Sequence, residues 1–314
     1  GEESAGKTLL GTDFGVSTQK LGGIVLYNDA EQAFDTRWAE KQGLDLSKIE
    51  LLPETKVEIV SDWLRDTVLF YRSKLTENEP ILFIQDSMAA LDIITKINSG
   101  QEENKAEMGG RAKAIYEMLR IRNEFLANMG VCSIFINQLR KKIGASQYEN
   151  PDTTTGGAAM KFFASQRLSL YSGKRITEKI KGFDERVGNY TSIRVMKNKV
   201  APPKPSFQGQ IFYHEDWVER IGFNPYFGLA EVLQRAGVIK AKHGIYKDME
   251  GNVIMKGEDK FNEALANDAK LRKKYIDLAG INTISKTREK LEAIDKNRFL
   301  VKGIKSEDEE DDNE

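Results

Sequence analysis

The sequence predicts an α/β fold with a mostly parallel β-sheet, an antiparallel extension and a small C-terminal α/β domain. Short apolar runs alternate with longer helical stretches from residue 1 to about 215, as in a covered parallel sheet. The first three runs are continuously apolar, which is typical of strands buried on both faces. The later runs alternate in polarity and therefore favour antiparallel strands.

The elements follow in order along the chain. Strands are expected at residues 23–27, 81–85, 131–137, 167–172, 191–198 and 208–214. Helices are expected at residues 6–20, 32–42, 56–75 and 111–129. Spacings of three and four mark the buried face of the third helix, formed by Val57, Val60, Leu64, Val68 and Tyr71.

Two long segments, residues 97–110 and 143–158, lack a regular pattern. Loops of this length in a compact domain are usually functional or disordered. The second is rich in Thr and Gly and follows an apolar strand, so we expect it at the carboxyl end of that strand, where α/β proteins place ligands.

The pattern changes beyond residue 218. Short helices are expected at residues 226–236, 258–278 and 285–296. They surround a hairpin whose turn is expected near Glu250 and Gly251. The sequence therefore predicts three parts, which are a core at 1–217, a small α/β domain at 218–305 and a disordered acidic tail at 306–314.

Composition and charge exclude several classes of protein. The 314 residues include 47 Lys or Arg and 48 Asp or Glu, and the 40% that are hydrophobic can form a sizeable core. No apolar run could cross a membrane and no secretory leader is visible, so we expect a cytoplasmic protein without a membrane partner. Cys132 is expected to be a small buried side chain in a strand. One cysteine and two histidines are too few for a structural zinc site.

The net charge of −1 is unevenly distributed. Residues 306–314 are strongly acidic, whereas residues 240–305 have a surplus of Lys and Arg. A solvated surface is one interpretation of the basic region. The other is a surface that binds a polyanion, with the acidic tail as a competitor.

The first eight residues, GEESAGKT, match the phosphate-binding pattern G-x-x-x-x-G-K-[ST]. Backbone N–H groups of such a loop surround phosphate oxygens, Lys7 supplies a cation, and the Thr8 hydroxyl can bind Mg²⁺. The strand that should precede the motif is absent, so we expect a fragment of a longer protein. The residues predicted to hold nucleotide here are Gly1, Glu2, Glu3, Ser4, Ala5, Gly6, Lys7, Thr8 and Leu9.

Three predicted strands end in polar residues suited to a triphosphate. Asp86 follows ILFIQ, where P-loop enzymes hold Mg²⁺. Glu31 could be the general base for an attacking water, or it and Asp29 could cap a helix. Gln138 could sense the terminal phosphate or could be a surface amide. With the phosphate loop, these residues predict binding of a nucleoside triphosphate.

The motifs resemble, in order, those of the bacterial and phage RecA recombinases. They are GEESAGKT, DAEQAFD, DSMAAL, FINQLRKKIG with NPDTTTGGAAMKFFAS, and VMKNKVAPP. The resemblance covers about residues 1–300, and the pattern INQxRxKIG…NPxTTTGG is highly specific. It implies a RecA-like P-loop NTPase core that lacks the family's N-terminal oligomerisation helix and first core strand.

The resemblance implies that Glu31 activates the hydrolytic water and that Asp86 serves the Mg²⁺ site together with Thr8. Asp35 would contact the adenine edge, and Trp38 would stack on the base.

The same resemblance implies that Gln138 couples the γ-phosphate to the following loop. Lys197 and Lys199 would reach the ATP of a neighbouring protomer as cations in trans. By composition alone, these two lysines are an exposed strand end.

The resemblance also assigns the two irregular segments to DNA. Met108 would wedge between bases, and Arg120 on the following helix would lie near phosphates. The second segment would bind the DNA backbone through Arg140, Lys142, Gly144, Thr155, Gly156 and Gly157. The basic region would gather duplex DNA, and the acidic tail would screen it.

The resemblance thus implies an ATP- and Mg²⁺-dependent recombinase with DNA-dependent ATPase activity. The protein would form filaments on single-stranded DNA and pair that strand with duplex DNA. It would act in a bacterial cell and be encoded by the host or by a phage. A RecA-fold helicase of the replicative type is one alternative, although it gives no reason for TTTGG. A non-hydrolysing ATP-dependent DNA-binding protein is another, and Glu31 argues against it. As a fragment, the chain could also remain monomeric.

Overall fold

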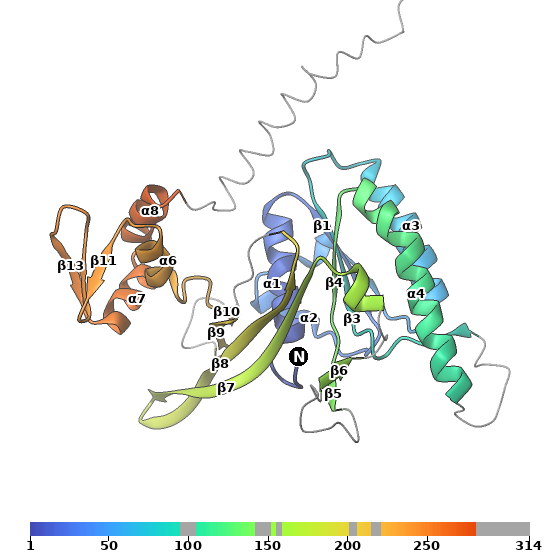
Figure 1. The fold of residues 1–314 in the computed structure, drawn as a ribbon, viewed down its shortest axis with the longest axis horizontal. Coiled ribbons are helices and arrows are strands. Elements are labelled where there is room, and N and C mark those ends of the chain that lie inside the picture. The colour runs from blue at the N-terminus through green and yellow to red at the C-terminus, as the bar shows by residue number, and fades with distance from the viewer. Residues whose placement is uncertain (95–104, 142–151, 155–158, 201–205, 215–220, 281–314) are drawn as a thin grey trace, which may run out of the picture.

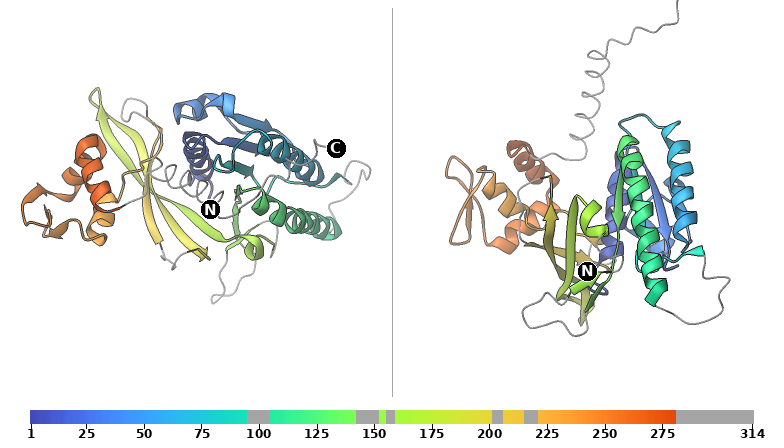
Figure 2. Two further views of the ribbon diagram at one scale, coloured as in Figure 1. Left: turned by 90° about the horizontal axis from the view of Figure 1, so that it is seen from above. Right: turned by 45° about the vertical axis from the view of Figure 1, so that its right-hand side comes forward.

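The computed structural model describes residues 1–94, 105–141, 152–154, 159–200, 206–214 and 221–280. A parallel sheet covered by helices, an antiparallel sheet and a small C-terminal domain make up the described chain (Figure 1). Both views of Figure 2 place the antiparallel sheet between the parallel sheet and the C-terminal domain. The predicted α/β class, with a parallel sheet and an antiparallel extension, is confirmed.

The parallel sheet has the order β2-β1-β3-β4, with bounds β1 Ile24–Asp29, β2 Ile49–Leu52, β3 Ile81–Asp86 and β4 Val131–Phe135. Every residue of β1 and β3 is buried, as the apolar runs at their starts predict. The same expectation for the third run was wrong, because no residue of β4 is fully buried. Asp29 pairs with Asp86 across these two strands, so their polar ends meet at one edge of the sheet. The short edge strand β2 was not predicted, because its sequence IELL has neither the length nor the burial of the central strands.

Helices cover both faces of the parallel sheet. On one face lie α1 (Lys7–Lys20) and α2 (Thr36–Lys41), and on the other lie α3 (Val57–Arg72) and α4 (Lys105–Asn128) (Figure 1). The predicted apolar stripe of α3 is confirmed, because Val57, Val60, Leu64 and Val68 are buried. None of the described helices has the length and apolar character needed to span a bilayer.

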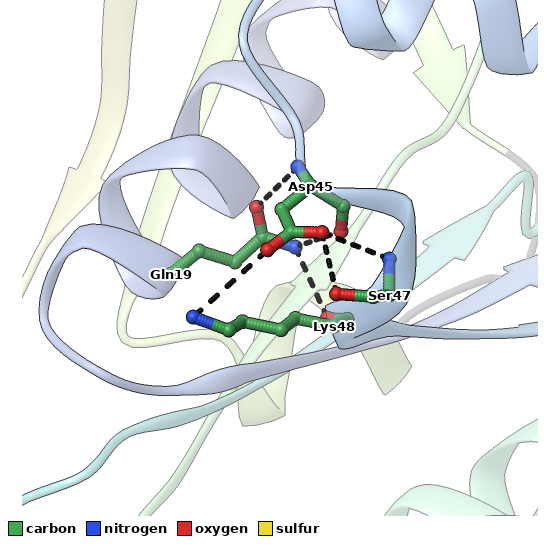
Figure 3. Close-up of polar contacts among 4 residues, drawn as sticks. All are labelled: Gln19, Asp45, Ser47 and Lys48. Carbon is green, nitrogen blue, oxygen red and sulfur yellow. Dashed lines mark hydrogen bonds and ion pairs between the residues drawn. The ribbon is translucent and has the colours of Figure 1, made fainter.

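A buried glutamine holds the edge strand β2 near the end of α1. Gln19 Nε2 donates to the carbonyl oxygens of Asp45 and Lys48 at 2.8 and 3.0 Å, and its Oε1 accepts from Asp45 N at 2.8 Å (Figure 3). These partners frame the short 3-10 helix η1 (Leu46–Lys48), where Ser47 donates twice to the Asp45 carboxylate. The two bonds from Ser47 lower the pKa of Asp45. Gln19 therefore fixes the approach of the chain into β2.

The two irregular segments are partly regular. Residues 105–110, expected in a loop, form the first turns of α4, so Met108 lies on a helix. Residues 152–154 form β6 (Asp152–Thr154), which pairs antiparallel with β5 (Leu139–Lys141). The remaining parts of both segments lie outside the described residues. The start of α4 and β6 could not be predicted, because their polar sequences have no apolar periodicity.

The antiparallel sheet has the order β10-β9-β8-β7, with bounds β7 Gln166–Ile180, β8 Phe183–Asn198, β9 Ser206–Phe212 and β10 Gly222–Phe223. The β7–β8 hairpin is much longer than predicted and turns at Lys181 and Gly182, both with positive φ. Its outer part extends beyond the pairing with β9, which begins at Gly188 on β8. That part is mostly exposed, so it lacks the apolar alternation on which strand prediction depends.

The C-terminal domain contains a three-stranded sheet and three described helices. Their bounds are α6 Leu229–Arg235, β11 Lys240–Lys242, β12 Ile245–Lys247, β13 Val253–Lys256, α7 Glu258–Asn267 and α8 Ala269–Leu278. The predicted hairpin is present as β12 and β13. The single helix expected at 258–278 was wrong: Asp268 has extended backbone, and its carboxylate accepts from the N–H groups of Lys270 and Leu271 at the start of α8. The expected helix at 285–296 and the tail at 306–314 lie outside the described residues.

Cys132 lies in β4, as predicted, but its expected burial was wrong because the residue is exposed. It lines a cavity of about 690 Å³ between β4, α4 and β7. Main-chain hydrogen bonds cross beside this cavity, where Glu2 N donates to Leu170 O at 2.9 Å and Leu139 N donates to Gly1 O at 3.1 Å. Residues 1 and 2 therefore connect β5 with β7.

Candidate functional site

The phosphate-binding motif forms a tight loop ahead of α1. Gly6, at the N-cap of α1, has a φ of 86°, and a Cβ there would approach Ile211 Cδ1 at 2.5 Å. A Cβ on Gly1 would come within 2.6 Å of Leu170 O. Ser4 also has positive φ, whereas Ala5 is fully buried beneath the loop. The two glycines of the pattern are therefore required by backbone conformation and close packing.

Lys7, the first residue of α1, folds back onto the loop. Its Nζ donates to the carbonyl oxygen of Glu2. Burial lowers the pKa of Lys7, and the carboxylates of Asp86, Glu31 and Glu3 act in the opposite direction. The ammonium group thus lies among carboxylates at the mouth of the loop.

Thr8 and the end of β3 form an oxygen-rich cluster. Thr8 Oγ1 donates to Asp86 Oδ2 at 2.6 Å, and the hydroxyl of Tyr27 in β1 donates to the same oxygen at 2.8 Å. Burial raises the pKa of Asp86, whereas these two hydrogen bonds lower it. Hydroxyl and carboxylate oxygens are the ligands that Mg²⁺ prefers, so Thr8 and Asp86 could hold that ion.

A second cluster joins the ends of three strands. Glu31 follows β1, Ser87 follows β3, and Gln138 lies between β4 and β5. Ser87 Oγ donates to Glu31 Oε1, and Gln138 Nε2 donates to the same oxygen at 3.1 Å. The sheet therefore brings together Glu31 and Gln138, which are far apart in the sequence.

These groups line one cavity of about 730 Å³. The phosphate loop, with Lys7 and Thr8, forms one wall of it. The chain after β1 and α2 contribute Glu31, Asp35 and Trp38. The antiparallel sheet forms a further wall through Arg186, Asn189, Ile211 and Tyr213.

The capping acids differ from the expectation. Asp35, not Asp29, is the N-cap of α2, and its Oδ1 accepts from Arg37 N and Trp38 N at 2.9 and 3.1 Å. Asp29 instead accepts from the N–H groups of Ala33 and Phe34 in the preceding turn. The helix therefore begins at Thr36, four residues later than predicted, because the turn held by Asp29 occupies residues 30–34.

Lys197 and Lys199 lie at the end of β8 and are not among the residues that line this cavity. Lys197 Nζ donates to the carbonyl oxygens of Lys161 and Phe162 at 2.7 and 3.1 Å, at the end of α5 (Ala159–Phe163). Their expected role concerns a neighbouring protomer and stays a prediction.

The residues expected to bind DNA are described only in part. Arg120 is exposed on α4 and pairs with Glu117 at 2.7 Å. Arg140 lies in β5 opposite Thr153 of β6. The other expected contacts in the second segment, Lys142, Gly144, Thr155, Gly156 and Gly157, lie outside the described residues.

Sequence reasoning missed several side chains at or beside the cavity, among them Tyr27, Arg186 and Tyr213. Tyr27 was hidden because its hydroxyl lies inside an otherwise apolar run. Arg186 and Tyr213 belong to the antiparallel sheet, where the Arg186 guanidinium lies 5.5 Å from the centre of the Tyr213 ring. No motif marks these two positions, and only the fold brings them to the phosphate loop.

The geometry defines a P-loop nucleotide-binding protein of the α/β class, with the loop, a carboxylate on the neighbouring strand and a polar cluster at one end of a parallel sheet. The family model for the RecA N-terminal domain matches residues 1–217. The chain belongs to the RecA family.

Individual relatives agree with this assignment. The chain is 35% identical to protein RecA of Bifidobacterium breve over 272 residues, 85% of this chain and 63% of the relative. It is 35% identical to protein RecA of Chloroherpeton thalassium over 272 residues, 86% of this chain and 70% of the relative. It is 32% identical to protein RecA of Cytophaga hutchinsonii over 301 residues, 92% of this chain and 78% of the relative.

Proposed function

We propose that the chain is the ATP- and Mg²⁺-dependent motor of a DNA recombinase, which assembles on single-stranded DNA and promotes pairing and strand exchange with a homologous duplex. One observation carries this proposal: Gln138 donates to Glu31 at 3.1 Å and is followed directly by β5. β5 and β6 flank residues 142–151 of the segment that the resemblance assigns to DNA. The nucleotide site and the expected DNA site are therefore adjacent in the chain.

The residues of the cavity fit a nucleoside triphosphate with Mg²⁺. The left-handed Gly6 aligns backbone N–H groups at the start of α1, where anions bind favourably. Lys7 would exchange the Glu2 carbonyl for a phosphate oxygen. Thr8 and Asp86 would hold Mg²⁺, whose charge stabilises phosphoryl transfer. Asp35 and Trp38 lie on the wall where a base would stack.

Glu31 is the proposed general base. Its Oε1 already accepts from Ser87 and Gln138, so a carboxylate with a fixed position lies in the cavity that contains Lys7. It would orient a water and take its proton during attack on the terminal phosphate. Gln138 would respond to the loss of charge at the terminal phosphate and alter the start of β5. Such a change would be a switch of the order–disorder type.

The proposed assembly places Lys197 and Lys199 against the nucleotide of a neighbouring protomer. The basic C-terminal domain would gather duplex DNA, with low sequence specificity because phosphate contacts dominate such binding. The family match ends at residue 217, which supports a core at 1–217. In the proposed organisation, a domain at 218–305 and a tail at 306–314 follow this core.

Replacement of the proposed base tests the ATPase. Glu31→Gln should lower DNA-stimulated ATP hydrolysis by roughly 10²- to 10⁴-fold while a labelled ATP still binds. Glu58→Gln makes the same chemical change at an exposed position of α3 and should retain wild-type hydrolysis. Hydrolysis that survives Glu31→Gln would remove the assignment of the base.

Joint-molecule formation tests the recombinase. The wild-type chain should pair a single strand with a homologous supercoiled duplex in the presence of ATP. Unwinding of a forked duplex without such pairing would instead identify a helicase. Sedimentation with ATP and single-stranded DNA should give large assemblies, and a persistent monomer would confine the filament proposal to a longer protein.

A further inference from the structure

The hydroxyl of Tyr27 is a buried group to which the proposed chemistry assigns no role. Tyr27 lies in β1 with 1% of its surface exposed, and its ring centre is 4.5 Å from that of Phe34. Its neighbours in β1 are mostly apolar, and a phenylalanine would fill the same space without the need to satisfy a hydroxyl. The partner of this hydroxyl therefore indicates why a tyrosine occupies the position.

That partner is the carboxylate expected at the Mg²⁺ site. Tyr27 Oη donates to Asp86 Oδ2 at 2.8 Å, and Thr8 Oγ1 donates to the same oxygen at 2.6 Å. Within the described part of the chain, no hydrogen-bond donor reaches the other oxygen, Oδ1. Two donors on one oxygen fix the rotation of the carboxylate and leave Oδ1 for a ligand.

The two donors differ in what else they can do. A threonine hydroxyl has one proton and two lone pairs, so Thr8 can bind a metal and still donate to Asp86. Tyr27 is not among the residues that line the cavity, so it can act only through Asp86. A tyrosine hydroxyl carries its proton at neutral pH, so Tyr27 is a donor to Asp86 there.

We propose that Tyr27 is a positioning residue, whose buried hydroxyl orients Asp86 for Mg²⁺ and so sets the Mg²⁺ concentration at which nucleotide binds tightly. This inference rests on the proposed function. Without the hydroxyl, Thr8 alone would hold Asp86, and the carboxylate would populate further rotamers. Only the Mg²⁺-dependent part of nucleotide binding would then weaken.

The test is a Mg²⁺ titration of nucleotide binding with Tyr27→Phe. Anisotropy of a fluorescent ATP analogue is followed from EDTA to saturating MgCl₂. The Mg²⁺ midpoint should rise roughly 3- to 10-fold, because one hydrogen bond to a charged group is lost. Affinity in EDTA should remain within about twofold of wild type, since no residue of the phosphate loop has changed.

A matched control and a coupled variant identify the path of the effect. Tyr71→Phe also removes a hydroxyl that donates to a carboxylate, that of Glu50, outside the cavity, and should leave the midpoint unchanged. In an Asp86→Asn background, Tyr27→Phe should cause no further shift, because the group on which it acts has been replaced. A further shift there would overturn the proposal.

A structural role gives a different pattern. If Tyr27 serves only packing, its substitution lowers the urea midpoint and weakens binding equally in EDTA and in MgCl₂, which would overturn the proposal. Tyr27→Leu provides a second variant, and its Mg²⁺ midpoint must rise at least as far as that of Tyr27→Phe. An unchanged midpoint in either variant, with a Mg²⁺-responsive wild type, refutes this inference alone. A wild-type chain that binds no nucleotide under either condition refutes the proposed function.

Discussion

Replacement of Gln19 with alanine should destabilise the core without weakening nucleotide binding. The substitution removes three hydrogen bonds of 2.8 to 3.0 Å to the backbone of Asp45 and Lys48 (Figure 3). At about 1 kcal/mol for each bond, with the partners able to recover some bonds to water, the free energy of unfolding should fall by about 2–3 kcal/mol. Twelve residues of helix place Gln19 about 18 Å from Lys7, so the phosphate loop should be unaffected.

Urea unfolding followed by circular dichroism measures the loss. For a unit of 150–250 residues, about 2–3 kcal/mol corresponds to a fall in melting temperature of roughly 4–12 °C. Lys48→Ala is the matched control, because it removes only an exposed ion pair with Asp45 at 3.9 Å and should cost less than about 0.5 kcal/mol. A Gln19→Ala variant as stable as Lys48→Ala would refute the argument that these bonds hold β2 in place.

Three further outcomes are expected. Gln85→Met should raise the free energy of unfolding by about 1 kcal/mol in urea, because neither polar atom of the fully buried amide has a hydrogen-bond partner among the described residues; a fall would show that the amide is satisfied. A Lys197→Ala/Lys199→Ala chain, inactive alone, should regain DNA-stimulated ATPase when mixed with Glu31→Gln, since one interface then contains every group; no recovery would contradict action in trans. Burial and the hydrogen bond to Glu50 raise the pKa of Tyr71 to about 12, so stability should fall as pH rises above about 10, where the unfolded state loses this proton first. Tyr71→Phe should reduce the fall of melting temperature with pH above about 10. A fall as steep as in the wild type would contradict this role of Tyr71.

The two central strands, β1 and β3, could be predicted from the sequence because they are buried on both faces. The runs at 23–27 and 81–85 are apolar almost throughout, and the structure buries every residue of β1 and β3. Parallel register then brings Asp29 and Asp86 to the same edge. For the same reason, Glu31, Asp86 and Gln138 could be expected near the phosphate loop, since the carboxyl ends of parallel strands meet.

Other features depend on contacts that a linear sequence does not display. Cys132 looked buried because its neighbours are apolar, whereas the cavity beside β4 exposes it. The outer part of the β7–β8 hairpin is held by backbone hydrogen bonds between mostly exposed residues, so the sequence has no apolar pattern that would predict it. The contact between the Tyr27 hydroxyl and Asp86 depends on the pairing of β1 with β3, so it could not be predicted from the sequence around Tyr27.

The backbone bonds of Gly1 and Glu2 to Leu139 in β5 and Leu170 in β7 make the loop of the phosphate-binding pattern a joint between the two-stranded sheet and the antiparallel sheet. A saturation-mutagenesis screen for ATP retention should therefore recover variants in β7, around Leu170, whose side chains never meet the nucleotide. Their signature would be a slow, temperature-sensitive loss of binding rather than a change in selectivity among nucleotides. Such variants would identify the residues that hold the loop in place. The screen alone would therefore report these supporting residues together with those that contact the nucleotide.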